Sequence, residues 1–351
     1  MQKDNLVKAG VFALFLTVAV FLCWEIYLRV RFYSKLSGID MSYDDNSALW
    51  ADKRSQVYMH SDQATVFIGS SRMRFDIDAP TWENMTGEKV IQLAQDGADP
   101  RPILSDLAAD SHFKGKLLID VTEGIFFYRD KDSTTAAITY YHSRTPTQRF
   151  SFQVNKVLES KFVFLDQDNF SINALLNRLP LRPRPGVVPD VVWPWFGTII
   201  HFDRQEYFTP AYLADTTQSN MTKAIWKFFG DTYPDSPVVG KKLDSLILDV
   251  KSDIDKIRAR GGQVIFTRTP SDGYYRNVEN KNYPRSGYWN RLLALAGCQG
   301  VYYADYPSTA PLICAEWSHL PISSARIYTR NLVNVLQNEK GWIFKKKTAV
   351  Q

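Results

Sequence analysis

Short apolar runs alternate with amphipathic helical patterns along most of the chain, and this alternation limits the folds that it can adopt. Apolar runs bounded by turn residues predict five strands, at residues 63–68, 89–93, 116–121, 263–267 and 300–304. Helical patterns fall at residues 102–109, 243–260, 288–296 and 323–336. Apolar strands that are separated by helices are typical of a parallel sheet covered on both faces. We therefore predict an α/β fold with a doubly wound parallel sheet, whose functional residues lie at the carboxyl ends of the strands.

The composition is that of a globular protein and excludes some classes of function. Of the 351 residues, 45% are hydrophobic and 23% are charged, so the chain can bury a sizeable core. The net charge of +5 is modest and forms no basic stripe with interleaved aromatic residues, so we expect no nucleic-acid partner. The five histidines lack the spacing of metal ligands, and we expect neither a metal site nor a cofactor.

An almost unbroken apolar run at residues 10–24, extended by Ile26-Tyr27-Leu28, makes the N-terminus a candidate membrane segment. With a span of about 20 residues at positions 9–28, it is long enough for one crossing. No small-x-small cleavage site follows the run, which favours an uncleaved anchor over a removed signal peptide. We assign residues 1–35 to this anchor and residues 36–351 to the folded domain.

The charges that flank the span do not decide its orientation. Lys3 and Lys8 precede the span, while Arg29, Arg31 and Lys35 follow it, so the positive-inside rule favours neither direction. A cytoplasmic domain therefore stays open on this ground.

Residues from about 127 to 240 interrupt the alternation and are rich in aromatic residues and proline. A stretch of this length between two strands indicates a functional cap or a large insertion with structure of its own. Exposed tryptophans, among them Trp193 and Trp195, would suit stacking on sugar rings. The alternative is that these aromatic side chains belong to the core.

Two short motifs, one near each end of the domain, carry the residues of a serine nucleophile and its base. Gly69-Ser70-Ser71-Arg72 follows the first predicted strand, and Glu316-Trp317-Ser318-His319 precedes the last predicted helix. A serine hydroxyl becomes nucleophilic when a base takes its proton and an acid orients that base. We predict Ser71 as nucleophile, His319 as base and Glu316 as the orienting acid, although each motif alone is also common in ordinary turns and surfaces.

An oxyanion formed at such a serine needs backbone N–H donors. Gly97, which follows the second strand, and the N–H of Ser71 are the candidate donors.

The cysteines leave two interpretations open. Cys23 lies in the span, whereas Cys298 and Cys314 bracket the approach to Glu316. A disulfide between Cys298 and Cys314 would pin that loop in an oxidising compartment. The alternative is two buried thiols, which pack as small hydrophobic side chains.

The order of these motifs resembles the SGNH (GDSL-like) hydrolase superfamily. The chain most resembles its membrane-anchored branch, which includes the D-alanyl transfer proteins of teichoic acid modification and the alginate O-acetylation proteins. The shared features are the anchor, the Gly69-Ser70-Ser71-Arg72 block, Gly97, and the Glu316-to-His319 block, which together frame about residues 60–335. The resemblance implies a three-layer α/β/α, SGNH-like (flavodoxin-like) fold for residues 36–351, on the extracytoplasmic side of the membrane.

The chain departs from the superfamily pattern at two places. Glu316 stands where aspartate is usual, and its extra methylene changes the reach of the carboxylate. The Gly-x-Asn block after the third strand is absent, and Asp120-Val121-Thr122-Glu123-Gly124 stands there instead. Thr122 is therefore the candidate polar side chain for the oxyanion hole.

The resemblance implies acyl transfer outside the cytoplasm of a bacterium, by a protein of the cytoplasmic (inner) membrane with its bulk on the periplasmic side. A membrane-bound O-acyltransferase would supply the acyl group, which we expect to be acetyl. Ser71 would carry this group as an ester, and a cell-envelope polysaccharide would accept it. One alternative is a glycan acetyl esterase that uses the same triad. Another is a catalytically silent glycan-binding subunit of a polysaccharide export complex.

Overall fold

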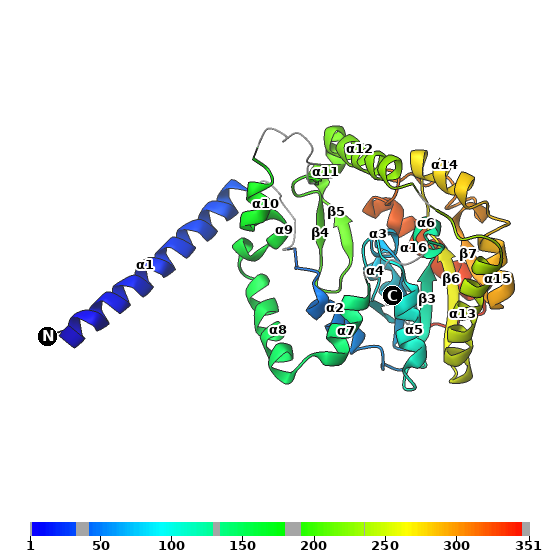
Figure 1. Ribbon diagram of the computed structural model, residues 1–351, viewed down its shortest axis with the longest axis horizontal. Coiled ribbons are helices and arrows are strands. Elements are labelled where there is room, and N and C mark those ends of the chain that lie inside the picture. The colour runs from blue at the N-terminus through cyan, green and yellow to red at the C-terminus, as the bar shows by residue number, and fades with distance from the viewer. Residues whose placement is uncertain (1, 33–41, 129–133, 180–190, 235, 346–351) are drawn as a thin grey trace, which may run out of the picture.

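The computed structural model of the chain describes residues 2–32, 42–128, 134–179, 191–234 and 236–345. Its centre is a sheet of five parallel strands, which confirms the strands expected from the apolar runs (Figure 1). The strands are β1 (Ala64–Ile68), β2 (Lys89–Gln92), β3 (Lys116–Asp120), β6 (Gln263–Arg268) and β7 (Gly300–Tyr302), in the order β2-β1-β3-β6-β7.

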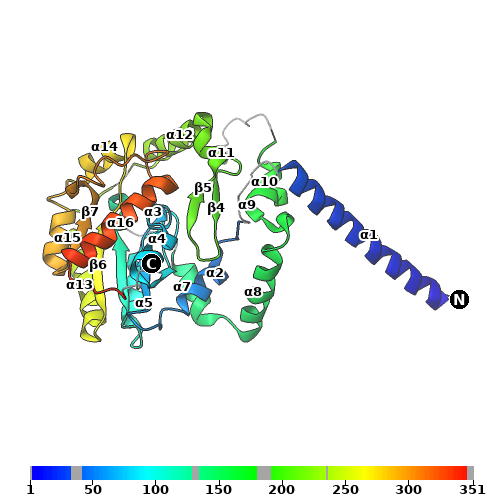
Figure 2. The ribbon, with the colours of Figure 1, turned by 180° about the vertical axis from the view of Figure 1, so that it is seen from behind.

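Helices cover both faces of this sheet, as the predicted α/β fold requires. The helices α5 (Arg101–Ala109) and α13 (Gly240–Ala259) pack against each other in front of the sheet in Figure 1, and α16 (Ile322–Asn338) lies in front of it in the reverse view of Figure 2. On that second face, α16 contacts α3 (Ser71–Asp76) and α4 (Ala79–Thr86). The four helices predicted from the sequence are all present, including α15 (Trp289–Ala296), with ends shifted by a few residues.

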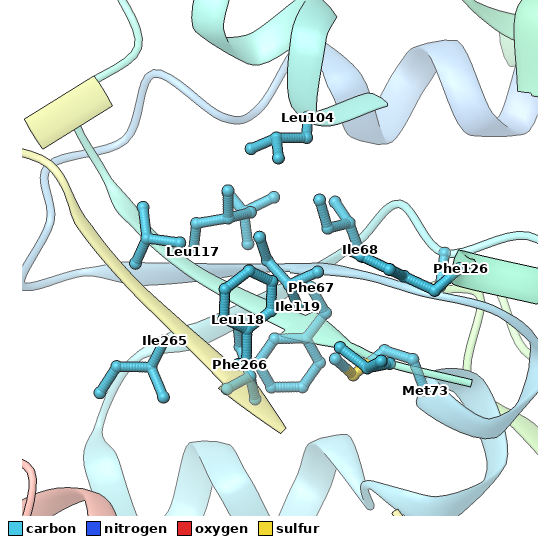
Figure 3. Packing of buried hydrophobic residues seen from close by; sticks show 14 of the residues in the cluster. Phe67, Ile68, Met73, Leu104, Leu117, Leu118, Ile119, Phe126, Ile265 and Phe266 are labelled. Carbon is cyan, nitrogen blue, oxygen red and sulfur yellow. The ribbon is translucent and has the colours of Figure 1, made fainter. Parts of the chain in front are cut away.

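The core follows directly from the apolar runs. Every residue of β1 and β3 is buried, because helices cover both faces of a parallel sheet and leave neither face open to solvent. Figure 3 shows Phe67, Leu118 and Phe266 from three adjacent strands packed together. The apolar stripe of α13 closes this core from one side, and six of its residues are buried: Leu243, Leu246, Ile247, Val250, Ile254 and Ile257.

The segment between β3 and α13 contains its own elements. After α6 (Glu123–Phe126) come α7 (Thr135–Ser143), which packs on α2 (Ser47–Arg54), and a series of short helices. These are α8 (Pro146–Glu159), η3 (Val163–Leu165), α9 (Gln167–Phe170) and α10 (Ile172–Leu176). An antiparallel pair follows, β4 (Thr198–Ile200) and β5 (Glu206–Phe208), and then α11 (Pro210–Ala214) and α12 (Thr216–Thr232). α14 (Gly273–Asn282) follows β6, and η4 (Tyr303–Asp305) follows β7.

The N-terminal helix α1 (Gln2–Arg31) projects away from the rest of the chain (Figure 1). Its stretch Asp4–Arg31 contains an 18-residue window with a mean hydropathy of 2.4 and is long and apolar enough to cross a membrane. Only its C-terminal end meets the domain, where Leu28 is buried with Val163 and Phe170.

Of the two interpretations left open for Cys298 and Cys314, the structure has the buried thiols and not the disulfide. Both residues are free, buried thiols, each held by a backbone carbonyl. The Cys298 thiol donates to the Val264 oxygen at 3.1 Å, and the Cys314 thiol lies 3.7 Å from the Pro270 oxygen. Burial raises the pKa of the Cys298 thiol to about 11, so it behaves as a small apolar side chain.

Gly69 offers a direct test of how tightly β1 and β3 approach. A Cβ at this position would lie 2.7 Å from the Asp120 Cβ and 2.9 Å from the Met73 Cβ. We expect Gly69→Ala to lower the free energy of unfolding by about 1–3 kcal/mol, because neither neighbour can move without shifting backbone. Thermal unfolding followed by circular dichroism measures the loss.

Gly287→Ala is the matched control, because its Cβ would meet only the Pro284 oxygen, at an ordinary 3.5 Å. Equal melting temperatures for the two variants would contradict the crowding inferred at Gly69.

Candidate active site

Ser71 lies at the carboxyl end of β1, the strand at which the order of the strands in the sheet reverses. β1 pairs with β2 on one side and with β3 on the other, so the connections that follow β1 and β2 run to opposite sides of β1. Such a switch point leaves a crevice at the carboxyl end of the strand. The strand ends at Ile68, Gly69 packs against Asp120, and Ser71 is the first residue of α3. The short turn from strand to helix therefore places the Ser71 side chain at the edge where ligands of such sheets bind.

Glu316 and His319 lie on a tight loop just before α16. Trp317, between them, has a φ of +80°, a left-handed conformation that turns the backbone sharply. Backbone hydrogen bonds close the loop: the Ala315 N–H donates to the His319 oxygen (2.9 Å) and the Asp272 N–H to the Trp317 oxygen (2.8 Å). This turn directs both side chains toward α3.

The structure brings the three predicted residues into one hydrogen-bonded array. Ser71 Oγ lies 2.8 Å from His319 Nε2, and His319 Nδ1 is hydrogen-bonded to Glu316 Oε1. With Glu316 ionised, Nδ1–H donates to the carboxylate and Nε2 is left to accept the Ser71 proton. The array thus has the connectivity of a nucleophile, a base and an orienting acid.

The second carboxylate oxygen of Glu316 has partners that the sequence motif did not reveal. Glu316 is completely buried, and its Oε2 accepts hydrogen bonds from Trp226 Nε1 on α12 (2.5 Å) and from the Ser318 N–H (3.2 Å). Trp226 belongs to the aromatic-rich segment at residues 127–240, and the abundance of aromatic residues there was the only sign in the sequence that it could be functional. The three donors fix the carboxylate in one orientation.

The imidazole of His319 is enclosed by aromatic and acidic groups. The Phe75 ring lies 4.4 Å from it, centroid to centroid, and Phe208 covers it from β5 at 6.3 Å. Burial by itself would lower the pKa of His319, but the adjacent Glu316 carboxylate, with a smaller contribution from Asp76, outweighs burial and raises the pKa above its ordinary value. The pH range in which the base is neutral is therefore shifted upward.

Asp76, at the end of α3, is a second residue that sequence reasoning missed. Its Oδ1 accepts a hydrogen bond from the Leu320 N–H at 2.8 Å, which fastens the residue after His319 to the helix that carries Ser71. Burial raises the pKa of Asp76 to about 7. Asp76 therefore ties together the two segments whose spacing sets the distance from serine to histidine.

Arg72 makes a similar connection from the opposite side. Its Nε donates to Ser318 Oγ (3.3 Å) and its Nη2 to Glu279 Oε1 on α14 (2.6 Å). Arg268 also pairs with Glu279 and with Glu123. Although burial alone would raise it, the two arginines hold the pKa of Glu279 at about 2. The two arginines and the two glutamates neutralise one another and hold Arg72 and Ser318 in fixed positions beside Ser71 and His319.

All three predicted oxyanion residues, Gly97, Ser71 and Thr122, line the same cavity. Gly97 has a φ of +59°, which a glycine adopts without strain. The Thr122 hydroxyl donates to Asp120 Oδ2 (3.0 Å) and lies 2.8 Å from Ser70 Oγ. Because its proton is directed to Asp120, Thr122 supports Ser70, and the backbone N–H groups of Ser71 and Gly97 remain the candidate donors.

The cavity that holds the array has a volume of about 1150 Å³. Its walls come from α9 and α10, from β4 and β5, and from α12 and α14, in addition to the edge of the sheet. Trp193 and Trp226 both line it, with ring centroids 5.0 Å apart. Trp195 instead stacks on Phe196 (5.1 Å) beside the end of α1. Among the residues that the structure describes, no group of histidine, cysteine or acidic side chains has the arrangement of a metal site.

The sequence matches no protein-family model, and a search of curated proteins finds no match. The chemistry of the site must therefore be argued from its geometry.

The pKa of His319 provides a test of the role of Glu316. We expect Glu316→Gln to lower this pKa, because the carboxylate is what raises it, and to slow the reaction of Ser71 with a fluorophosphonate by about 10²- to 10⁴-fold. Glutamine has one acceptor oxygen for the donors that now share two. In the wild type, labelling falls as the pH drops through the raised pKa of His319, and in the variant this acid limb moves to lower pH.

The measurements are an NMR titration of the His319 imidazole and labelling rates at several pH values. An unchanged His319 pKa in Glu316→Gln would rule out the carboxylate as its cause.

Trp226 is expected to act through Glu316. We predict that Trp226→Phe slows fluorophosphonate labelling of Ser71 by about tenfold, the rate equivalent of roughly 1.4 kcal/mol, because a hydrogen bond to a charged acceptor is lost. Trp193→Phe is the control, because Trp193 contacts Trp226 in the same cavity without bonding to Glu316. Similar rates for the two variants would mean that only packing is affected.

Proposed function

We propose that the chain is a serine acyltransferase of SGNH (GDSL-like) type that moves an acyl group, most simply acetyl, onto a cell-envelope polysaccharide. The observation that carries the proposal is the Ser71–His319–Glu316 array in a cavity of about 1150 Å³. A serine hydroxyl that shares its proton with an oriented imidazole is the arrangement of acyl-transfer enzymes.

The position of the array in the fold supports the SGNH assignment. The nucleophile follows the first strand, the histidine and its acid precede the last helix, and the strands have the flavodoxin-like order 2-1-3-4-5 when numbered along the chain. In this proposal residues 36–351 form the SGNH-like domain, and about residues 127–240 form an aromatic-rich insertion that walls the cavity.

The proposed reaction has two stages. His319 Nε2 takes the Ser71 proton as Oγ attacks the carbonyl carbon of the acyl donor, and the backbone N–H groups of Ser71 and Gly97 stabilise the oxyanion. The leaving group departs with the proton from His319, which leaves an acyl ester on Ser71. An acceptor hydroxyl then gives its proton to His319 and attacks the ester carbonyl, and His319 returns the proton to Ser71 Oγ as the ester bond breaks.

The shape of the cavity favours a sugar hydroxyl over water as the acceptor. An acetyl group would fill a small part of it, and the space that remains is lined by aromatic side chains, among them Trp193, Trp226 and Tyr275. Aromatic faces stack on sugar rings and hold a hydroxyl in position for attack. Hydrolysis by the same residues, as in a glycan acetyl esterase, remains the second candidate because the array is chemically identical.

The proposed setting is the inner membrane, with α1 as an uncleaved anchor and the domain on the periplasmic side. A membrane-bound O-acyltransferase is the proposed source of the acyl group. The length and hydropathy of α1 support the anchor.

The nucleophile can be tested because the motif offers two adjacent serines. We expect the full-length protein in detergent to release nitrophenol from p-nitrophenyl acetate, and Ser71→Ala to abolish this release. Ser70→Ala is the control, because Ser70 Oγ faces Thr122 and not His319, and it should retain acyl-enzyme formation. Full turnover by Ser71→Ala would exclude Ser71 as the nucleophile.

Transfer and hydrolysis differ in the fate of the acyl-enzyme. We expect intact-mass spectrometry to detect an acetyl adduct on the wild type that persists in buffer and disappears when an acceptor oligosaccharide is added. An adduct that decays equally fast without oligosaccharide would assign the protein to the esterases.

A further inference from the structure

Two short helices near the end of α1 expose rows of large apolar side chains. On α8, Phe150 and Val157 are 72% and 62% exposed and share one side of the helix with Val154. Ile172 and Leu176, the first and last residues of α10, are 76% and 52% exposed, and Leu179 in the turn after α10 is 51% exposed. We define these six residues as the apolar rows. Singly exposed apolar residues are ordinary, but two groups of large ones, each spaced by three or four residues, indicate a contact surface.

The opposite side of α8 buries two charged side chains next to Phe152. Lys156 Nζ and Glu159 Oε2 form a buried ion pair at 2.6 Å, and Lys156 Nζ also donates to the Asp44 oxygen at 2.9 Å. A helix on a water-exposed surface turns its apolar side to the core and its charges outward. On α8 the outer side instead carries Phe150, Val154 and Val157, while Lys156 and Glu159 are buried, as expected where the outer side faces a non-aqueous medium.

The elements that carry the apolar rows are attached to α1. Glu25 accepts hydrogen bonds from the Val163 and Phe164 N–H groups of η3, at 3.1 and 3.2 Å. The Phe164 ring also lies 5.5 Å from that of Phe21. η3 in turn contacts α8 and α9, and α9 contacts α10. The apolar rows are thus continuous with the C-terminal end of the apolar helix.

If α1 crosses a membrane, the contacts of η3 with Phe21 and Glu25 lie below the point where α1 leaves the bilayer. Phe21 precedes Leu28, the last apolar residue before Arg29, by about two helical turns, or roughly 10 Å. The headgroup layer and upper acyl chains occupy a depth of about 5–10 Å, so a segment that packs on Phe21 lies within that layer. In Figures 1 and 2, α8 runs across the direction of α1 and not alongside it, as a helix lying on the membrane plane would.

We infer that the apolar rows of α8 and α10 lie in the interfacial layer of the bilayer that α1 crosses, with lipid as their occupant. Two arginines lie near this surface: Arg29 donates to the Lys161 oxygen, and Arg149 is exposed on α8. Cationic side chains at this level would attract anionic lipid headgroups. The inference rests on the anchor role proposed for α1 and is independent of the chemistry at Ser71.

The test uses the full-length chain in vesicles of phosphatidylethanolamine and phosphatidylglycerol. In a Cys23→Ser background, Val154→Cys and Leu176→Cys are each labelled with the fluorophore NBD. Leu248→Cys is the matched control, because Leu248 is 52% exposed, as is Leu176, but lies on α13, on the side of the domain away from α1 (Figure 1). The unsubstituted Cys23→Ser protein shows that the buried Cys298 and Cys314 do not react.

We expect blue-shifted NBD emission at 154 and 176, quenched several-fold more by doxyl-labelled lipid than at 248. Equal accessibility of all three labels to aqueous iodide would overturn the inference and would point to a partner protein as the occupant. Circular dichroism verifies that each variant is folded, and fluorophosphonate labelling of Ser71 is recorded separately, so that loss of the membrane contact and loss of the proposed catalysis give separate readings.

Discussion

The parallel pairing of β1 with both β2 and β3 determines where the candidate site can form. A strand that is hydrogen-bonded on both sides and buried on both faces cannot shift its register without moving its whole apolar set. Its carboxyl end is therefore a fixed point, and the turn at Gly69 fits only because no side chain separates it from Asp120. The position of Ser71 follows from this packing, and the loop of His319 is positioned against it through Asp76 and Arg72.

Glu316 illustrates how a buried charge is accommodated. An unpaired carboxylate without solvent would cost several kcal/mol, but this one accepts hydrogen bonds from His319, Trp226 and Ser318. The three donors also explain why glutamate, with its longer side chain, can stand where the resemblance leads us to expect aspartate. Its reach is taken up by the turn at Trp317 and by a partner on α12.

The sequence was informative wherever function depends on local pattern. Apolar runs predicted the five strands, and the ends of β1 and of the loop before α16 placed Ser71, Glu316 and His319 in contact range. Trp226 and Asp76 were not predicted, because their roles arise from contacts between segments that no periodicity relates. The state of Cys298 and Cys314 stayed open for the same reason: they are near in sequence, but each packs against a different carbonyl of the core.

The cavity joins two regions that are separate in sequence. Ser71 lines one part of it, and Asp168, Asn177 and Arg178 of the α9–α10 segment line another. Since α9 and η3 pack at the end of α1, the proposed membrane contact would hold the serine at a constant height above the lipid. If the proposed acyl transfer takes place at Ser71, this fixed height would restrict it to polymer segments close to the bilayer, and segments that have diffused farther out would not be modified.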